Sequence, residues 1–368
     1  MLKFIRGKAQ QPSTERQKIQ RELFAFRKTI QHGFPNKPTC LAWDPVLRLM
    51  AIGTATGAIK VVGKPGVEFY GHHTSSDHHI THLLFVPNEG RLISLCDDNS
   101  LHLWEINDTS MEEVKANKLE GKLNKITVMR LESSGRHLLL GLEGGNVNLL
   151  NVATFEFSSA IIFQDKIVQS VEEDYKINPG AVEAIEEQPG NPDNVLIGYN
   201  RGLMVLWNRK TSTAQQTFIS SQQLESVSWE ADGKQFVTSH NDGSYAYWDA
   251  AATGSQANNS KPLEEPSTPY GPFPCKAITK IVWTHDATQP TQDLLLFSGG
   301  MTRASYGDKN TITALRGRHI SEGKHVIFDF TSKIIDFFTI SAPDGEKGVC
   351  ALIVLAEVEL VAIEFFSI

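Results

Sequence analysis

Hydrophobic and polar residues alternate in many short segments of this 368-residue chain. Five segments share one pattern, in which a Gly or Asn is followed by apolar residues at the third and fifth places. That period of two is typical of a β-strand buried on one face. Gly or Asn at the first place suits a tight turn with positive φ, which other side chains resist. The five segments are residues 57–62 (GAIKVV), 99–104 (NSLHLW), 145–150 (GNVNLL), 202–207 (GLMVLW) and 243–248 (GSYAYW).

These segments recur at nearly constant distance. Their first residues are separated by 42, 46, 57 and 41 residues, close to the roughly 40–45 residues of a four-stranded propeller blade. Three segments end in Trp, and residues 248–249 spell the WD dipeptide of such blades. The longer interval predicts an insertion near residues 156–180. A β-sandwich would also contain many short strands, but it does not predict this repeat.

Two weaker units follow the five. Residues 277–331 contain four strand-like pieces, whereas residues 334–366 contain only three. Residues 23–30 (LFAFRKTI) alternate like a strand and have no sheet of their own, so they could supply the missing strand and remove an open edge. The sequence therefore predicts an all-β fold: a seven-bladed WD40-type β-propeller over residues 23–368, closed by an N-terminal strand and preceded by a basic leader at residues 1–22.

Charge is distributed unevenly along the chain. The formal net charge is −7, which argues against a dedicated nucleic-acid binder. Residues 1–38 nevertheless contain nine Lys and Arg against two Glu. An apolar edge beside cations can rest on an anionic bilayer, at about 1 kcal/mol per cation near the surface, whereas a solvated terminus is the simpler interpretation. The membrane-surface candidates are Lys3, Phe4, Arg6 and Lys8.

Nothing in the sequence indicates catalysis. The motifs of serine hydrolases, zinc proteases, P-loop proteins and dinucleotide-binding folds are absent from it. Five histidines are close enough in sequence to bind Zn²⁺ or Ni²⁺ adventitiously, but no carboxylate–thiolate framework accompanies them. We therefore expect a solvated loop between the first two blades, and predict no enzyme activity, no cofactor and no metal site. The five histidines are His72, His73, His78, His79 and His82.

Cysteine spacing and the lengths of the apolar runs indicate the cellular compartment. Its four cysteines are too widely spaced for a C-x-x-C pair, and a secreted protein of this size would more often show paired cysteines. No apolar run reaches the roughly 20 residues that span a bilayer, and the first residues lack the apolar core of a signal peptide. These features predict a cytoplasmic protein.

Partner-binding candidates lie in two irregular segments. Residues 299–308 (GGMTRASYGD) contain Arg303 and Tyr306, residue types that often anchor interfaces, although such a loop could simply cover the propeller face. Residues 262–274 contain five prolines and predict an extended connection between the fifth and sixth blades, either a docking segment or a plain linker. The Trp residues that we assign to the blade core are Trp104, Trp207, Trp229, Trp248 and Trp283.

Several long strings resemble the lethal giant larvae family, relatives of tomosyn and of yeast exocytic regulators. The resemblance extends from residue 1 to about residue 363. The strings are residues 23–38 (LFAFRKTIQHGFPNKP), 50–61 (MAIGTATGAIKV), 65–71 (PGVEFYG), 97–104 (DDNSLHLW), 220–224 (SSQQL), 269–278 (PYGPFPCKAI) and 299–308 (GGMTRASYGD).

The resemblance implies a cytoplasmic polarity scaffold at the cell cortex. Family members antagonise atypical protein kinase C with its Par partner, bind non-muscle myosin II, contact syntaxin-type SNAREs and assist exocytosis. They are sometimes described as GTPase activators, which no residue here indicates.

One departure from the family pattern bears on function. The family chain continues into a second propeller and a loop of kinase-target serines, whereas this sequence contains no basic, serine-rich loop. Regulation by that phosphorylation is therefore not carried over. Three hypotheses result: a scaffold, a peripheral lipid-binding protein that acts through its leader, and a truncated product with little activity.

Overall fold

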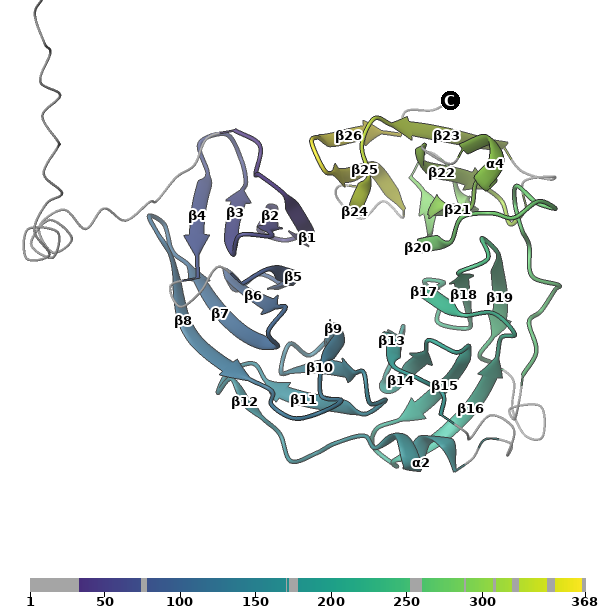
Figure 1. Ribbon diagram of the computed structural model, residues 1–368, viewed down its shortest axis with the longest axis horizontal. Helices are drawn as coiled ribbons and strands as arrows, with labels where there is room; N and C mark the ends of the chain where they lie inside the picture. Colours follow the sequence, from purple (N-terminus) through teal and green to yellow (C-terminus); the bar gives the residue numbers. More distant parts are fainter. Residues whose placement is uncertain are drawn as a thin grey trace, which may run out of the picture.

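In the computed structural model, small sheets form a ring around a common centre (Figure 1). In each run of consecutive antiparallel strands, the first strand in the chain lies nearest the centre and the later strands lie further out. The structure describes residues 33–73, 78–169, 171, 178–251, 260–287, 289–306, 309–319, 324–342 and 348–365, with the backbone alone for residues 289–291 and 305–306. The all-β prediction is confirmed for these residues.

The first four sheets each contain four antiparallel strands. The first sheet consists of β1 (Pro38–Asp44), β2 (Leu49–Thr54), β3 (Ala58–Val62) and β4 (Glu68–His72). The second consists of β5 (Ile80–Val86), β6 (Arg91–Cys96), β7 (Ser100–Ile106) and β8 (Met111–Lys118). The third consists of β9 (Ile126–Leu131), β10 (His137–Leu142), β11 (Val147–Asn151) and β12 (Glu156–Phe157). The fourth consists of β13 (Val182–Gln188), β14 (Asn191–Tyr199), β15 (Leu203–Asn208) and β16 (Thr213–Ile219).

The remaining strands form a sheet of three and a sheet of seven. The three are β17 (Leu224–Trp229), β18 (Gln235–His240) and β19 (Tyr245–Asp249). The seven are β20 (Ile278–Asp286), β21 (Gln289–Gly299), β22 (Asn310–Arg316), β23 (Lys324–Phe330), β24 (Ile334–Ser341), β25 (Val349–Ala356) and β26 (Leu360–Glu364). One parallel pair, Asp286 with Val349, connects β20 to β25. Apart from that pair, the strands divide into β20–β23 and β24–β26, which match the predicted pieces of residues 277–331 and 334–366.

Within the described residues, two short helices lie outside the sheets. Helix α2 (Gln164–Val168) falls in the predicted insertion, and helix α4 (Arg303–Tyr306) follows β21. Neither is long enough to cross a bilayer.

The predicted turn residues adopt the predicted backbone conformation. The first residues of the five repeated segments all have positive φ, between 72° and 95°. At Gly202 an added Cβ would lie 2.4 Å from the carbonyl oxygen of Ser220, so glycine is required there for space as well as for φ. Asn99 tolerates φ of 72° and uses its amide to donate to the carbonyl oxygens of Leu119 (2.6 Å) and Asn124 (2.9 Å).

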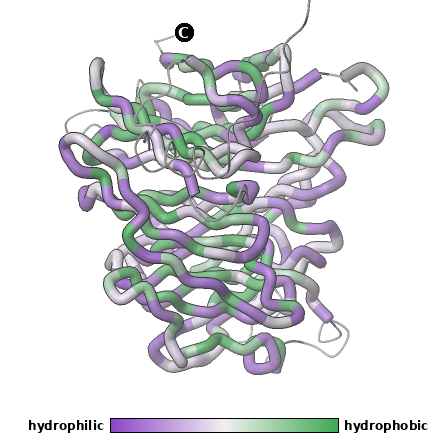
Figure 2. Tube along the Cα trace, turned by 60° about the vertical axis from the view of Figure 1, so that its left-hand side comes forward, coloured by the Kyte–Doolittle hydropathy of each residue, from purple (hydrophilic) through white to green (hydrophobic). Residues whose placement is uncertain are grey.

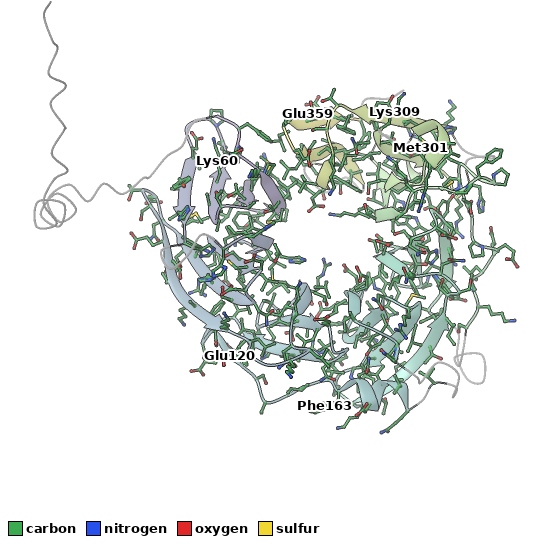
Figure 3. All side chains as sticks on the ribbon, viewed as in Figure 1. Lys60, Glu120, Phe163, Met301, Lys309 and Glu359 are labelled. Atoms are coloured by element: carbon green, nitrogen blue, oxygen red, sulfur yellow. The ribbon has the colours of Figure 1, made fainter. Side chains whose placement is uncertain are left out.

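The hydrophobic core lies between neighbouring sheets. Ile59 and Val61 of β3 pack with Ile80 of β5, and similar clusters lie between the later neighbours. Hydrophobic and hydrophilic residues alternate along many strands in Figure 2, and the side chains fill the space between sheets in Figure 3. The assignment of five Trp residues to the core is confirmed, because each is at most 8% exposed. These residues are Trp104, Trp207, Trp229, Trp248 and Trp283.

The two ends of the ring are also in contact. Leu41 of β1 and Ile52 of β2 share a buried cluster with Leu355 of β25. Close by, the rings of Trp43 and Phe338 stack with their centroids 5.3 Å apart. The first and last strand groups therefore pack through side chains. The predicted closing strand, residues 23–30, lies outside the described residues.

Candidate functional site

The proline-rich segment follows the outer edge of the fifth sheet. The backbone N–H of Leu263 donates to the carbonyl oxygen of Tyr247 at 2.8 Å, and Ser267 exchanges two backbone hydrogen bonds of 2.9 Å with Tyr245. Further along, the Tyr270 hydroxyl lies 2.9 Å from Thr313 Oγ1 on β22. The segment connects the fifth sheet to β20, as predicted, but it turns at residues 268–271, where the Gly271 N–H donates to the Thr268 carbonyl oxygen at 3.0 Å, and its backbone pairing to β19 was not foreseen. It is tied to two neighbouring sheets and is more than a plain linker.

Helix α4 is attached to the end of this segment. Met301 precedes the helix, is 2% exposed and accepts a 2.8 Å hydrogen bond from the Lys276 N–H at its carbonyl oxygen. Arg303 donates twice, from its backbone N–H to the Pro274 carbonyl oxygen and from Nε to the Cys275 carbonyl oxygen, both at 2.9 Å. Two of the strings that resemble the family, residues 269–278 and 299–308, therefore meet in the structure.

The junction presents an apolar and a cationic side chain on its surface. Phe273 is 67% exposed, and the Arg303 side chain is exposed while its Nε is held by the backbone. Figure 3 shows Met301 beside α4 at the outer part of the ring. We call the surface of Phe273, Pro274 and Arg303, with the buried Cys275 beneath it, the Phe273–Arg303 face. Large aromatic and Arg side chains on a rigid support are typical of interface hot spots. The structure describes the backbone of Tyr306 in α4 but not its side chain.

Sequence reasoning missed Phe273. The feature of the sequence that could have identified Phe273 is its position between prolines, because a segment that cannot join a sheet interior has no neighbouring strands to bury the ring on both sides. Arg303 was found because of its residue type. Its hydrogen bond to Cys275, 28 positions away, could not be read from the sequence.

A second arginine lies between the fifth sheet and the sheet of seven. Arg318 lies over the rings of Tyr247 and Trp283, with Cζ 5.2 and 5.4 Å from their centroids. Its carbonyl oxygen accepts a 2.7 Å hydrogen bond from the Tyr245 hydroxyl, and its Nη2 donates to Gln235 Oε1 at 2.9 Å. A cation over aromatic faces is attractive by about 0.5–2 kcal/mol. Arg318 thus joins the fifth sheet to the sheet of seven.

The predicted histidine cluster is divided between surface and interior. His79 is exposed, and His78 lies 3.2 Å from Asp97 Oδ1. The prediction of a solvated loop is wrong for His73, which is 3% exposed, and for His72 and His82, which lie in β4 and β5 and are half-buried. For His73 the reason is that the chain turns inward after β4, where the His73 N–H donates to the Gly57 carbonyl oxygen at 3.2 Å.

Buried histidines belong to hydrogen-bonded networks inside two sheets. In the second sheet, Trp104 Nε1 donates to Ser94 Oγ at 2.9 Å, and that oxygen lies 3.3 Å from His73 Nε2. Burial, and secondarily the His102 ring, lowers the pKa of His73 to about 4. Burial raises the pKa of the neighbouring Cys96 thiol to about 12. At neutral pH His73 is therefore uncharged and Cys96 keeps its proton.

The fifth sheet contains a similar network. Trp248 Nε1 donates to Thr238 Oγ1 at 2.9 Å, and that hydroxyl lies 3.1 Å from His240 Nε2. Ser220 Oγ is 3.2 Å from the same nitrogen. Because His240 is 0% exposed, this Ser–His pair cannot meet a substrate. Its role is in the core.

Charged side chains occupy the innermost strands. Lys280 of β20 forms a 2.6 Å ion pair with Asp336 of β24 and donates to the Phe337 carbonyl oxygen at 2.7 Å. Burial, and secondarily the charge of Glu225, raises the pKa of Glu183 on β13 to about 7. The centre of the ring is therefore polar.

Comparison with known proteins agrees with this architecture. The chain is 44% identical over 369 residues to Lethal(2) giant larvae protein of Drosophila pseudoobscura pseudoobscura, covering 98% of this chain and 30% of the relative. It is 40% identical over 388 residues to Lethal(2) giant larvae protein homolog 1 of Rattus norvegicus, covering 99% of this chain and 36% of that relative.

A third relative, LLGL scribble cell polarity complex component 2 of Mus musculus, is 41% identical over 380 residues, which is 99% of this chain and 36% of the relative. The LLGL family profile, described as LLGL2, matches residues 266–367. The chain belongs to the lethal giant larvae family. It spans about a third of the length of the curated relatives that it matches.

The matched regions coincide with features described above. The WD domain, G-beta repeat profile matches residues 63–105, which include the Trp104 network of the second sheet. The LLGL profile match, residues 266–367, includes both Phe273 and Arg303. The Phe273–Arg303 face therefore lies inside the region that matches the lethal giant larvae family profile. The membrane-surface candidates Lys3, Phe4, Arg6 and Lys8 lie outside the described residues.

Proposed function

We propose that this member of the lethal giant larvae family is a non-enzymatic scaffold in cell polarity and regulated exocytosis, cytoplasmic and peripheral at the cell cortex. The observation that supports it most is the similarity over nearly the whole chain to a relative named as a scribble cell polarity complex component. The proposed partners are the atypical protein kinase C/Par complex, non-muscle myosin II and syntaxin-type SNAREs.

The scaffold we propose is a seven-bladed propeller. The first four sheets, the fifth sheet, β20–β23 and β24–β26 would be its blades, and residues 23–30 would close the ring as the outer strand beside β26. Contact of Leu41 and Ile52 with Leu355 supports this arrangement, because it already brings the first and last strand groups together.

The binding surface we propose is the Phe273–Arg303 face, extended by Tyr306. It combines an exposed aromatic ring with an exposed guanidinium whose Nε is already oriented by a backbone carbonyl. A side chain that is partly fixed before binding loses less conformational entropy on association. This surface would therefore act as an anchor for a protein partner.

Binding of purified partners tests the proposal. The chain is immobilised, and purified atypical protein kinase C–Par complex, myosin II or a syntaxin cytoplasmic domain is flowed over it. We expect saturable binding of at least one partner, weakened at least about tenfold by Arg303→Ala or Phe273→Ala. Matched controls are Arg201→Ala and Phe163→Ala, because Arg201 is also exposed and donates to a backbone carbonyl and Phe163 is 45% exposed.

Each outcome has a distinct meaning. No saturable binding of any of the three partners would contradict the scaffold function and favour a product with little activity of its own. Binding that the control variants weaken as much as Arg303→Ala would retain the scaffold but reject the Phe273–Arg303 face.

A second candidate function rests on the basic leader. Nine Lys and Arg against two Glu within residues 1–38 favour peripheral binding to acidic lipid. Deletion of residues 1–12 separates the two functions, because partner binding should survive it and recruitment to anionic liposomes should not.

A further inference from the structure

Three donor side chains converge inside the second sheet. His73 follows β4, Cys96 ends β6 and His102 lies in β7. They are 3%, 3% and 5% exposed, and one donor atom of each lies within 4.8 Å of the other two. A neutral imidazole and a thiolate are the donors that a zinc ion prefers.

One carboxylate faces both imidazoles and is hydrogen-bonded to one of them, that of His102. His102 Nδ1 lies 2.8 Å from Glu113 Oε1, and His73 Nδ1 lies 3.5 Å from Glu113 Oε2. A ring that directs Nδ1–H at a carboxylate keeps its lone pair on Nε2, the arrangement found behind histidine ligands of metals. Both rings therefore turn Nε2 away from Glu113.

The spacing on the Nε2 side suits a tetrahedral ion. His73 Nε2 lies 3.5 Å from Cys96 Sγ. With Zn–N of about 2.0–2.1 Å and Zn–S of about 2.3 Å, tetrahedral N and S ligands lie about 3.5 Å apart. His102 Nε2 is 2.9 Å from Ser100 Oγ and His73 Nε2 is 3.3 Å from Ser94 Oγ, and metal bonds would replace these two neutral contacts.

Comparison with the fifth sheet shows what a purely hydrogen-bonded network looks like. His240 is satisfied at both nitrogens, with Nδ1 2.9 Å from Ser244 Oγ and Nε2 3.1 Å from Thr238 Oγ1. In the second sheet, the same Trp–hydroxyl pair is present, but buried His73 Nδ1 and Glu113 Oε2 have no hydrogen bond. The thiol lies on the Nε2 side of His73, whereas the two atoms without a hydrogen bond face each other at 3.5 Å on its Nδ1 side.

We propose that His73, Cys96 and His102 bind one Zn²⁺ ion, with Glu113 hydrogen-bonded to the His102 ring and facing the His73 ring. On binding, the Cys96 S–H bond breaks, a Zn–S bond forms and the proton passes to the solvent. Both imidazoles bind as neutral ligands through Nε2. Three protein ligands leave the fourth tetrahedral position to a water molecule. The ion would join the segment after β4 to β6 and β7, and so would fasten the first sheet to the second.

Titration of the intact chain with zinc tests the site. The protein is treated with a chelator, dialysed and titrated with Zn²⁺ in a calorimeter. We expect one ion per chain with sub-micromolar Kd, weakened at least about tenfold by Cys96→Ser and by His102→Gln. Cys350→Ser is the matched control, because Cys350 is a partly exposed thiol away from the cluster and should leave Kd unchanged.

Cobalt gives a readout that does not depend on stability. Co²⁺ bound at the site should produce a thiolate-to-cobalt charge-transfer band, which Cys96→Ser should abolish while Cys350→Ser retains it. Circular dichroism confirms that each variant is folded. Absence of binding at about 100 μM Zn²⁺ would overturn the proposal. Binding that persists in Cys96→Ser but is lost in Asp97→Asn would do so too, because it would place the ion at the surface group of His78, Asp97 and Asp98.

Discussion

Replacement of Leu355 by Ala should destabilise the chain by opening the contact between the first and last strand groups. Leu355 is 0% exposed, and its cluster partners Leu41 and Ile52 are 7% and 3% exposed, so little of the lost volume can be refilled by solvent. Leu-to-Ala changes at such sites cost about 2–5 kcal/mol. We expect about 3 kcal/mol, and a fall in Tm of several degrees.

A double-mutant cycle shows whether this loss comes from the contact between the ends. Urea unfolding of L41A, L355A and the double variant should give a coupling free energy of about 1 kcal/mol, within the range for side chains in contact. The control is Leu360→Ala, a β26 residue that is 38% exposed and should cost no more than about 0.5 kcal/mol. Strict additivity of L41A and L355A would refute the reasoning, because residues that do not touch do not couple.

Three further predictions concern charge. Burial lowers the pKa of His240 to about 4, below its ordinary 6.5. The unfolded state therefore binds the extra proton at a higher pH than the folded state does, and the free energy of unfolding should fall by up to about 3 kcal/mol as pH drops from 6.5 towards 4. Urea unfolding checks this, because His240→Gln should make the free energy of unfolding depend less on pH. Burial raises the pKa of Glu183 from 4.5 to about 7, so the stability that the protonated carboxyl contributes is lost as pH rises through 7. Glu183→Gln should therefore raise the free energy of unfolding by about 1 kcal/mol at pH 8, after allowance for solvent screening, and leave it unchanged at pH 4.5. Equal gains at both pH values would contradict this. Reversing the charges of Lys3, Arg6 and Lys8 should reduce cosedimentation with anionic liposomes several-fold; unchanged binding would exclude the leader as a lipid contact.

The strand pattern could be predicted because it depends on local chemistry. The sequence predicts three strands within residues 334–366, and β24, β25 and β26 lie there, while Gly243 and Asn99 take positive φ as their turn positions require. The apolar period of two is a direct consequence of a sheet buried between neighbours, so it survives in a single sequence.

The candidate sites could not be predicted in the same way. Cys96 lies 23 positions from His73, and only the inward turn after β4 brings them within 3.5 Å. The high density of histidines in the sequence favoured a surface loop. Whether each histidine is buried or exposed depends instead on its position relative to the turn after β4. The Phe273–Arg303 face likewise depends on a hydrogen bond between segments 28 positions apart. Such contacts are set by tertiary packing, which a one-dimensional pattern does not encode.

The central claim is that one ring of sheets, completed by residues 23–30 beside β26, forms the scaffold. Hydrogen–deuterium exchange of the intact chain tests it most directly, because backbone amides paired in a sheet exchange slowly and those of an unpaired segment exchange rapidly. We predict that amides in residues 23–30 are protected to about the same degree as those of β26, and that the variant lacking residues 1–12 keeps this protection. Exchange of residues 23–30 at the rate of an unstructured peptide, while β26 stays protected, would contradict the claim.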